Sequence, residues 1–311
     1  MNYKQCAKAL LEHDNFIILT HRNPDGDTCG SSAALCSALR RAGKTAYLYK
    51  NEQITGKHLL FTEQFFAPDD YVPEFVVAVD VASETMLPNG FEGKIDVCID
   101  HHPSNSHYAK DWLVKGEKSS CGEIIFELVC MIADAPTAEE ATWLYIALST
   151  DTGCFQYANT NSASFKAASE LLKYGADNVN VNWEYFRKVS RARLKLESMI
   201  YAGLEYYRDG LISMATVTLD MMEKAGAEEK DCDDLANLCG RAEGALLNIT
   251  VREKENGVCK ISMRSSEPVN SSDICAVFGG GGHALAAGCT IMGSPDKVKK
   301  MLLQVIDEVW K

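Results

Sequence analysis

The sequence lacks the features of a disulfide-stabilised or membrane-spanning protein. Its twelve cysteines are scattered through apolar segments without a single C-x-x-C pair, which indicates buried free thiols in a reducing compartment. No apolar run approaches the ~20 residues that a membrane-spanning helix needs. The first residues, "MNYKQCAKALLEHDN", contain no basic segment followed by an apolar one, so they predict an amphipathic helix and not a signal peptide. We therefore expect a cytoplasmic protein that does not associate with membranes.

The chain also has fewer basic than acidic residues. The chain has 31 Lys and Arg against 43 Asp and Glu, which gives a formal net charge of -12. A groove for long nucleic acid normally shows a net basic face, so this balance argues against such a partner. A small phosphorylated ligand held by a few local cations remains compatible with it.

The first half of the chain has the pattern of an α/β domain. Its 311 residues exceed one ordinary domain, so we expect two. Strand-like apolar runs alternate with helical segments, and the nearly continuous runs are typical of a mostly parallel sheet. The expected strands are 16–20, 45–50, 75–82 and 94–100, and the expected helices are 28–42, 122–132 and 137–149.

The second half predicts a smaller α/β domain. Strand signals stop at residue 180, and 180–207 has helical spacing that suits a connecting helix. Strands are expected at 211–218, 245–253 and 258–265, followed by a helix at 294–311 with Pro295 in its first turn. We therefore divide the chain into a first domain at 1–178, a helical linker at 179–207 and a second domain at 208–311, with the boundary inside 176–205.

Eight polar residues follow apolar segments of the first domain. Because open α/β sheets form their sites at the carboxyl ends of strands, these side chains are expected to converge. They are His21, Asp25 and Asp27 after the first strand, Asp80 after the third, Asp100, His101 and His102 at the fourth, and Asp151 after a helix.

This donor set predicts two divalent metal ions. Carboxylates and imidazoles without thiolates fit manganese best, with magnesium and cobalt as alternatives. Six or seven ligands are too many for one metal and suit two, which share a bridging carboxylate and lower the pKa of a common water molecule.

Each motif also has an ordinary structural explanation. "DGD" in a loop is often turn chemistry, and a strand-terminal aspartate such as Asp80 often caps a helix, a role for which Ser83 competes. Cys29 is expected to be a packing residue and not a nucleophile. The combination of motifs in this order favours the dinuclear site.

The same motifs resemble a known family. "HRNPDGDTCGS", "VDVAS", "DHH" and "STDTGCF" resemble the four motifs of the DHH phosphoesterase superfamily, and "GGGGHALAAG" at 279–288 resembles the DHHA1 substrate-binding domain. The two resemblances account for nearly the whole chain, and no motif residue departs from the pattern.

The resemblance implies a role for each of these eight residues. His21, Asp25 and Asp80 would hold one metal. Asp27, Asp80, His101 and Asp151 would hold the other, with Asp80 bridging. His102 would meet the scissile phosphate and Asp100 would orient a histidine, although which of the two histidines ligates is left open.

In the second domain, glycines leave backbone amides free to approach a phosphate, although a tight turn is the simpler explanation. An arginine is suited to bidentate phosphate recognition. The resemblance implies that the substrate lies in a cleft between the domains. The residues expected to bind it are Arg264, Ser265, Gly280, Gly281, Gly282 and His283.

The resemblance also narrows the activity. The chain lacks the transmembrane, PAS and degenerate cyclase segments of membrane-bound cyclic-dinucleotide phosphodiesterases and the extra domain of RecJ-like exonucleases. It carries DHHA1 and not the DHHA2 domain of family II pyrophosphatases. With these members of the superfamily excluded, the chain resembles the stand-alone nanoRNase and pAp phosphatase type.

The function expected from this type is manganese-dependent hydrolysis of oligoribonucleotides of two to five nucleotides, and of 3′-phosphoadenosine 5′-phosphate (pAp) to AMP. A water-derived hydroxide activated by the two metals would attack phosphorus in line. The alternatives are cleavage of cyclic-di-AMP or linear diadenylate (pApA), a phosphatase for one small bisphosphate, and a non-catalytic nucleotide sensor. The sequence does not decide the oligomeric state, and a homodimer is compatible with it.

Overall fold

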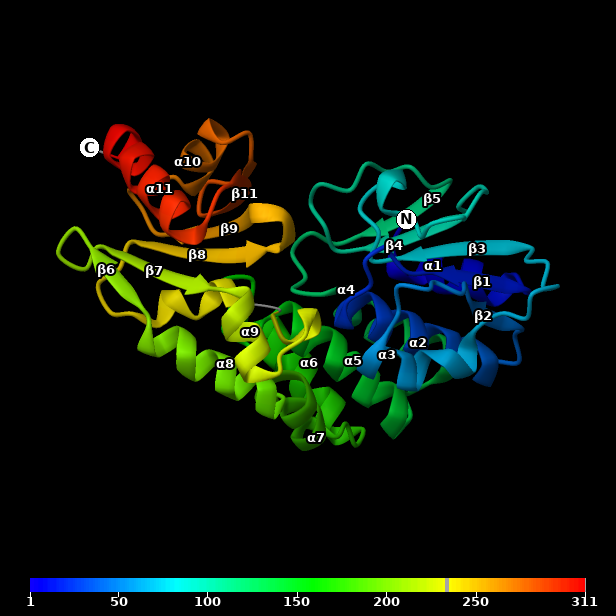
Figure 1. The fold of residues 1–311 in the computed structure, drawn as a ribbon. Coiled ribbons are helices and arrows are strands. Elements are labelled where there is room, and N and C mark those ends of the chain that lie inside the picture. Colours follow the sequence, from blue (N-terminus) through cyan, green and yellow to red (C-terminus); the bar gives the residue numbers. More distant parts are fainter. Residues whose placement is uncertain (233–234, 311) are drawn as a thin grey trace. The chain divides into compact units, whose positions relative to one another are not determined.

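The computed structural model describes residues 1–232 and 235–310 and divides into two compact units, residues 1–188 and 189–311 (Figure 1). None of the helices in these described segments combines the length and the apolar character needed to cross a bilayer. All twelve cysteines are free, as the sequence predicted.

The N-terminal unit is built on a five-stranded sheet with the order β2-β1-β3-β4-β5, and all its pairs are parallel. Its strands are β1 (Phe16–Leu19), β2 (Ala46–Leu48), β3 (Phe75–Val79), β4 (Val97–Asp100) and β5 (Asp111–Val114). Its helices are α1 (Tyr3–Glu12), α2 (Gly26–Arg41), α3 (Gly56–Thr62), α4 (Cys121–Ala133), α5 (Ala138–Asp151), α6 (Ser162–Lys173) and α7 (Asn178–Asn182).

The predicted parallel α/β sheet is therefore confirmed, with one strand more than expected. β5 was missed because it is short and its first two residues, Asp111 and Trp112, are exposed, so it has no apolar run. The helix expected from residue 28 begins two residues earlier, at Gly26, because the side chain of Asp25 caps it.

Helix α2 lies at the centre of this unit. Of its sixteen residues all but Ser37, Arg40 and Arg41 are buried, and it packs against both α4 and α5. A Cβ atom on Gly30 would lie 2.3 Å from the carbonyl oxygen of Trp143 in α5. The absence of a side chain at this position is what lets the two helix backbones approach so closely.

The C-terminal unit contains a mixed six-stranded sheet with the order β10-β11-β9-β8-β7-β6, in which only β7 and β8 pair in parallel. Its strands are β6 (Glu205–Tyr207), β7 (Ile212–Val217), β8 (Leu247–Lys254), β9 (Val258–Ser265), β10 (Gly281–His283) and β11 (Ala286–Met292). Its helices are α8 (Arg191–Ala202), α9 (Leu219–Ala225), α10 (Ser271–Val277) and α11 (Pro295–Val309).

The segment predicted as one connecting helix is interrupted. It consists of α7, a π-helical turn at Trp183–Arg187, and α8, whose N-terminus is capped by Ser190. The last three residues of the predicted linker form strand β6, which pairs with β7. Helical spacing could not reveal this, because a three-residue edge strand is defined by its pairing partner and not by its own periodicity.

Candidate metal centre

The parallel sheet brings most of the predicted ligands to one edge. His21 lies two residues beyond β1, Asp80 directly follows β3, and Asp100 ends β4 just before the two histidines. Since the strands are parallel and adjacent, their carboxyl ends lie together. The edge thus receives side chains that are up to 81 positions apart in the sequence, as the strand pattern predicted.

Helices α2 and α5 supply the remaining carboxylates. Asp25 is the N-cap of α2, where its Oδ1 accepts hydrogen bonds from the backbone amides of Asp27 and Thr28. Asp27 lies in the first turn of α2 and is buried, and Asp151 is the last residue of α5. The helix-capping explanation therefore holds for Asp25, but it leaves Asp27 and Asp80 unexplained.

A first group of carboxylates surrounds the Nε2 atom of His101. Asp80 Oδ1 lies 3.5 Å from this nitrogen, and Asp27 Oδ2 and Asp151 Oδ2 each lie 3.6 Å from it. The Nδ1 atom of His101 lies 3.2 Å from the carbonyl oxygen of Lys118, to which it donates. In the neutral tautomer Nε2 is therefore unprotonated and directs its lone pair toward the carboxylates.

A second group forms around His21, which is also buried. Its Nε2 atom lies 3.6 Å from Asp25 Oδ1 and 3.8 Å from Asp80 Oδ2. Asp80 therefore belongs to both groups, since its Oδ1 faces His101 and its Oδ2 faces His21. Among the described residues, three overlapping sets of donors could each hold a cation: His21, Asp25 and Asp80; Asp27, His101 and Asp151; and Asp80, His101 and His102.

The electrostatics of Asp80 fit a bound cation. Burial, reinforced by the negative charge of Asp27, raises its pKa well above the usual range, and its Oδ1 has no hydrogen-bond partner in the described part of the chain. A buried carboxylate oxygen without a partner is costly, so such atoms are normally paired or coordinate a metal. Its backbone is left-handed as well, with φ at 62°, a strained conformation typical of functional sites.

Asp27 is held firmly by the neighbouring helix. Its carboxylate accepts hydrogen bonds from the backbone amides of Cys121 at 2.7 Å and Gly122 at 2.9 Å, at the start of α4, and from the hydroxyl of Ser31 at 3.1 Å. Despite these bonds, burial and the nearby Asp151 carboxylate raise its pKa well above the usual range. The positive N-terminus of α4 thus compensates only part of the buried charge.

His102 is arranged differently from His101. Its Nδ1 atom donates to Asp100 Oδ1 at 2.8 Å, and this hydrogen bond raises the pKa of His102. The bonds from His102 and from Asn105, at 2.6 Å, outweigh the effect of burial and lower the pKa of Asp100. The Nδ1 atom of His102 is therefore occupied by Asp100, whereas His101 directs its Nε2 atom toward the acidic cluster.

The sequence alone did not identify several asparagines that hold the candidate ligands in place. Asn105 anchors Asp100, Asn159 donates to the backbone oxygen of Asp151 at 3.1 Å, and the amide of Asn51 donates to the backbone oxygen of His21 at 3.0 Å. Single asparagines in loops are ordinary turn residues, so no sequence signal distinguished them.

In the C-terminal unit, the glycine-rich run forms β10 and its approach. A Cβ atom on Gly280 would lie 2.3 Å from the backbone oxygen of Gly288, and one on Gly282 would lie 2.5 Å from that of Ala286. Close packing against β11 therefore accounts for these two glycines. Gly281 is exposed, with open space where its side chain would be, so a ligand could approach its backbone.

The other predicted substrate residues lie in the same part of the sheet. Arg264 and Ser265 end β9, and His283 is exposed at the end of β10. The hydroxyl of Ser265 donates to the backbone oxygen of Val269 and accepts from Ser271, so it is engaged within the unit. The guanidinium group of Arg264 donates to the backbone oxygen of Met263 at 3.0 Å.

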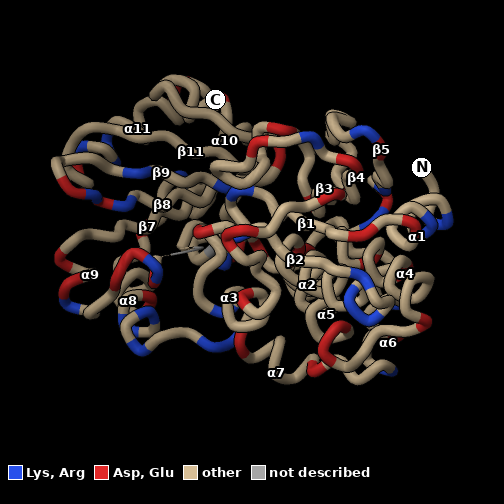
Figure 2. The backbone as a smooth tube through the Cα atoms, turned by 90° about the vertical axis from the view of Figure 1, so that its right-hand side faces the viewer, with Lys and Arg blue, Asp and Glu red and all other residues tan. Residues whose placement is uncertain are grey.

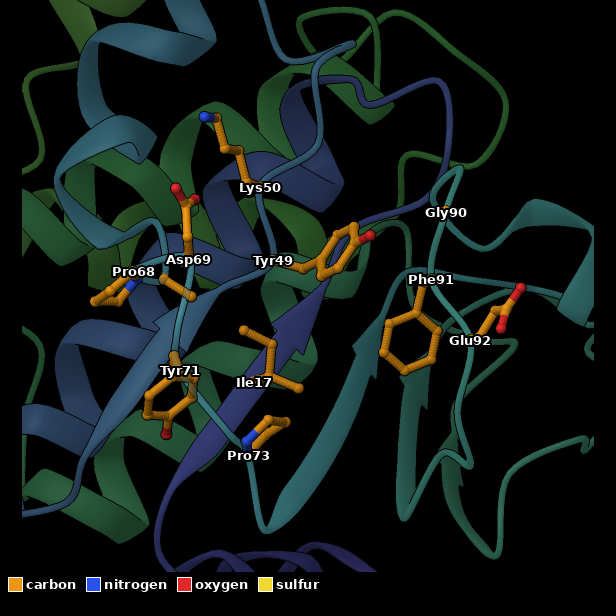
Figure 3. A pocket seen from close by; sticks show the side chains of 11 residues that line it. Ile17, Tyr49, Lys50, Pro68, Asp69, Tyr71, Pro73, Gly90, Phe91 and Glu92 are labelled. Atoms are coloured by element: carbon orange, nitrogen blue, oxygen red, sulfur yellow. The ribbon is translucent and has the colours of Figure 1, made fainter.

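A separate cavity of about 460 Å³ lies in the N-terminal unit (Figure 3). Aromatic and proline side chains form much of its wall, including Tyr49, Tyr71 and Phe91. None of the predicted metal ligands lines it, so this hollow is distinct from the acidic cluster.

Comparisons with known proteins agree with the class that the fold and this cluster define, a metal-dependent phosphoesterase. Residues 15–148 match the DHH family, N-terminal domain, and residues 212–311 match the DHHA1 domain. The chain belongs to the DHH family, in the branch that carries a C-terminal DHHA1 domain.

Individual relatives cover nearly the whole chain. A bifunctional oligoribonuclease and PAP phosphatase NrnA from Thermus thermophilus is 33% identical over 94% of this chain and 89% of its own length. The cyclic-di-AMP phosphodiesterase PdeA from Listeria monocytogenes is 25% identical over 97% of this chain but only 49% of its own length. The crystal structure of an exopolyphosphatase-related protein from Bacteroides fragilis superimposes with a TM-score of 0.82, at 22% identity, over 98% of this chain and 96% of that one.

Proposed function

We propose that this protein hydrolyses oligoribonucleotides of two to five nucleotides to mononucleotides, and pAp to AMP, with two manganese ions. The observation that carries the proposal is Asp80, a buried carboxylate whose two oxygens face two separate donor groups and whose Oδ1 has no hydrogen-bond partner among the described residues. The NrnA relative, named for oligoribonuclease and PAP phosphatase activity, supports this substrate class.

In this proposal one cation would be held by His21, Asp25 and Asp80. The other would be held by Asp27, Asp80, His101 and Asp151. Imidazole nitrogens together with carboxylates, and no thiolate, suit manganese. When bound, the cations supply Lewis acidity that lowers the pKa of a water molecule and offsets charge on the phosphoryl group.

The protein's own contribution to the chemistry centres on His102. Protonated and oriented by Asp100, it donates a hydrogen bond from its Nε2 atom to a non-bridging phosphoryl oxygen, where negative charge grows in the transition state. Asn105 fixes Asp100 in turn, through a 2.6 Å hydrogen bond. No covalent enzyme intermediate is required, and the buried Cys29, whose pKa burial raises, is a packing residue.

We assign substrate binding to the C-terminal unit. Arg264 and His283 would hold a phosphate or base edge, with Gly280, Gly281 and Gly282 as the glycine run that a ligand approaches and Ser265 as a neighbour that shapes the turn. We accordingly describe residues 1–178 as the catalytic domain and 208–311 as the substrate-binding domain, joined by the mainly helical segment between them.

A second candidate activity is cleavage of cyclic-di-AMP or linear pApA, favoured by the Listeria relative. It uses the same centre, because both reactions transfer a phosphoryl group to water. A non-catalytic sensor would be expected to have lost ligands, and every His and Asp of the four motifs is present here. The free thiols fit a cytoplasmic location. The proposed activity is compatible with either a monomer or a homodimer.

The test is an assay of the purified protein on pAp, pApA, cyclic-di-AMP and RNA of two to twenty nucleotides, with manganese or with EDTA. We expect manganese-dependent release of AMP from pAp and of mononucleotides from the shortest RNAs, and none with EDTA. Asp80→Ala should lower kcat by at least about a thousandfold on every substrate, because it removes the shared ligand.

The control is the circular dichroism spectrum of Asp80→Ala, which should match that of the wild type, since Asp80 lies beyond the last residue of β3. Near-normal manganese-dependent activity in this variant would refute the dinuclear centre. Activity confined to cyclic-di-AMP would favour the second candidate.

A further inference from the structure

The segment that follows Asp151 is a tightly constrained turn. Three consecutive residues, Gly153, Cys154 and Phe155, have left-handed backbones with φ of 55°, 56° and 63°. For the two that are not glycine this conformation is strained. The buried Thr152 holds the turn, because its backbone oxygen accepts from the amides of Gln156 at 2.9 Å and Tyr157 at 3.0 Å.

This turn presents the ring of Tyr157 to solvent. A Cβ atom built on Gly153 would lie 2.4 Å from ring atoms Cε1 and Cζ and 2.6 Å from Cε2, so the phenol end of the ring lies directly over the glycine. Tyr157 is nevertheless 58% exposed. One side of the ring thus packs on backbone, and much of the rest is left uncovered within this unit.

Residues before and after the exposed ring in the chain connect it to the acidic cluster. Gly153, which it covers, is two residues after Asp151. Asn159, two residues beyond the tyrosine, donates to the backbone oxygen of Asp151 at 3.1 Å and approaches its Oδ2 at 3.4 Å. The strained turn therefore fixes an aromatic surface beside a carboxylate of the candidate metal centre.

We propose that Tyr157 is the stacking surface for a nucleobase of the substrate, namely the base on the nucleotide whose phosphate is attacked. The proposal rests on the function proposed above and adds a specificity-determining residue to it. A rigid aromatic ring with an open face stacks on any base, because every base has a π face. Recognition by Tyr157 would therefore require a base without selecting which one.

A ring covering one glycine also explains why residue 153 has no side chain. Its positive φ favours glycine, and any Cβ there would displace the tyrosine ring. Cys154 and Phe155 accept the same backbone conformation without being glycine, so the turn alone does not demand glycine at 153. The contact with the ring adds to the preference for glycine there.

The experiment compares Tyr157→Ala and Tyr157→Phe on two substrates, pAp and a ribose 3,5-bisphosphate that lacks the base. Stacking acts on bound substrate and transition state alike, so Tyr157→Ala should raise KM for pAp about tenfold with a much smaller change in kcat. KM for the base-free substrate should change less than twofold. Tyr157→Phe should restore the wild-type KM, because phenylalanine keeps the ring.

The matched control is Tyr206→Ala. Tyr206 is 56% exposed and lies on β6, at the opposite edge of its sheet from β10, so its removal should leave both KM values unchanged. Equilibrium binding provides a readout without turnover. Calorimetry should show that Tyr157→Ala raises the dissociation constant of AMP about tenfold and hardly changes that of ribose 5-phosphate.

Equal losses for substrates with and without a base would overturn the proposal, and so would a Tyr157→Phe variant as impaired as Tyr157→Ala, since the hydroxyl would then be the functional group. Failure of the proposed function looks different. In that case wild-type protein would hydrolyse neither substrate, while the AMP-binding comparison would still report on Tyr157.

Discussion

At the scale of single residues, two buried aspartates at the ends of adjacent strands have opposite environments. Asp100 accepts three hydrogen bonds, from the backbone of His101 and the side chains of His102 and Asn105. Asp80 Oδ1 accepts none from the described residues, and its neighbours include the acidic Asp27. Asp100 is therefore stabilised by the fold itself, whereas the buried carboxylate of Asp80 lacks such compensation at Oδ1, which fits its proposed role as a metal ligand.

This contrast predicts opposite effects of the same substitution. In EDTA, Asp80→Asn should raise the free energy of unfolding by about 1–2 kcal/mol, because it removes a buried negative charge that has no hydrogen-bond partner at Oδ1. Asp100→Asn should lower it by about 1–3 kcal/mol, because the new amide group faces the amide group of Asn105. Urea denaturation of the metal-free proteins measures both values.

Added manganese supplies the control for these two variants. It should raise the melting temperature of wild-type protein and of Asp100→Asn, but much less that of Asp80→Asn, which lacks the shared ligand. A metal-free Asp80→Asn protein less stable than wild type would contradict the interpretation of Asp80.

At the scale of secondary-structure elements, α2 connects the core to the candidate centre. Its first turn carries Asp25 and Asp27, and its middle packs on α5 through Gly30. The neighbours that a side chain at Gly30 would meet are backbone atoms, the oxygen of Trp143 at 2.3 Å and the nitrogen of Ala147 at 3.2 Å. Backbone atoms inside a helix cannot rotate away as side chains can, so the two helices would have to separate.

Gly30→Ala should therefore lower the free energy of unfolding by about 1–3 kcal/mol. It should also reduce activity, because separating α2 from α5 moves Asp27 relative to Asp151. Urea denaturation and the pAp assay measure the two effects.

The matched substitution is Gly203→Ala, at the end of α8. Its Cβ would lie no closer than 3.5 Å to any atom outside its immediate neighbours, and its φ of -100° suits alanine. We expect a change within about 0.5 kcal/mol. If Gly30→Ala were equally harmless, the close approach of α2 and α5 would not be needed for stability.

At the scale of the whole molecule, the negative charge limits which substrates can be held. Two divalent cations offset only part of the net charge of -12, and acidic and basic segments are interspersed on both units (Figure 2). Some basic residues are already paired: Arg252 and Lys254 both bind Glu229, at 2.5 Å and 2.7 Å. The phosphates of a long RNA would therefore find few free partners.

We accordingly expect kcat/KM to be highest for RNA of two to five nucleotides and to fall steeply as the chain lengthens. The measurement is initial rates on a length series from two to twenty nucleotides, with one sequence and one fixed moderate salt concentration. Repeating the series at lower salt serves as a control, because repulsion by the surface should then disfavour the longest RNA further. Equal or rising efficiency at twenty nucleotides would instead indicate a processive exonuclease.

How far the sequence predicts this molecule depends on the kind of contact involved. The parallel sheet and the edge where the polar residues gather follow from local patterns, since apolar runs identify strands and parallel strands align their carboxyl ends. Local patterns did not predict the short strands β5, β6 and β10. Residues such as Asp111 or Gly281 form strands only because a neighbouring strand pairs with them. The family resemblance added the division of ligands between two metals, which spacing alone could not assign.

By itself, then, the sequence determined which side chains meet at the edge of the sheet. Tertiary structure decided how each one is oriented. The Lys118 backbone oxygen, seventeen residues along the chain, directs the lone pair of His101, and the α4 amides, ninety-four and ninety-five residues from Asp27, hold its carboxylate. Tautomer, charge and the exposure of the Tyr157 ring depend on hydrogen bonds and packing between distant segments, and no local pattern encodes such contacts, because any residue with a backbone can provide them.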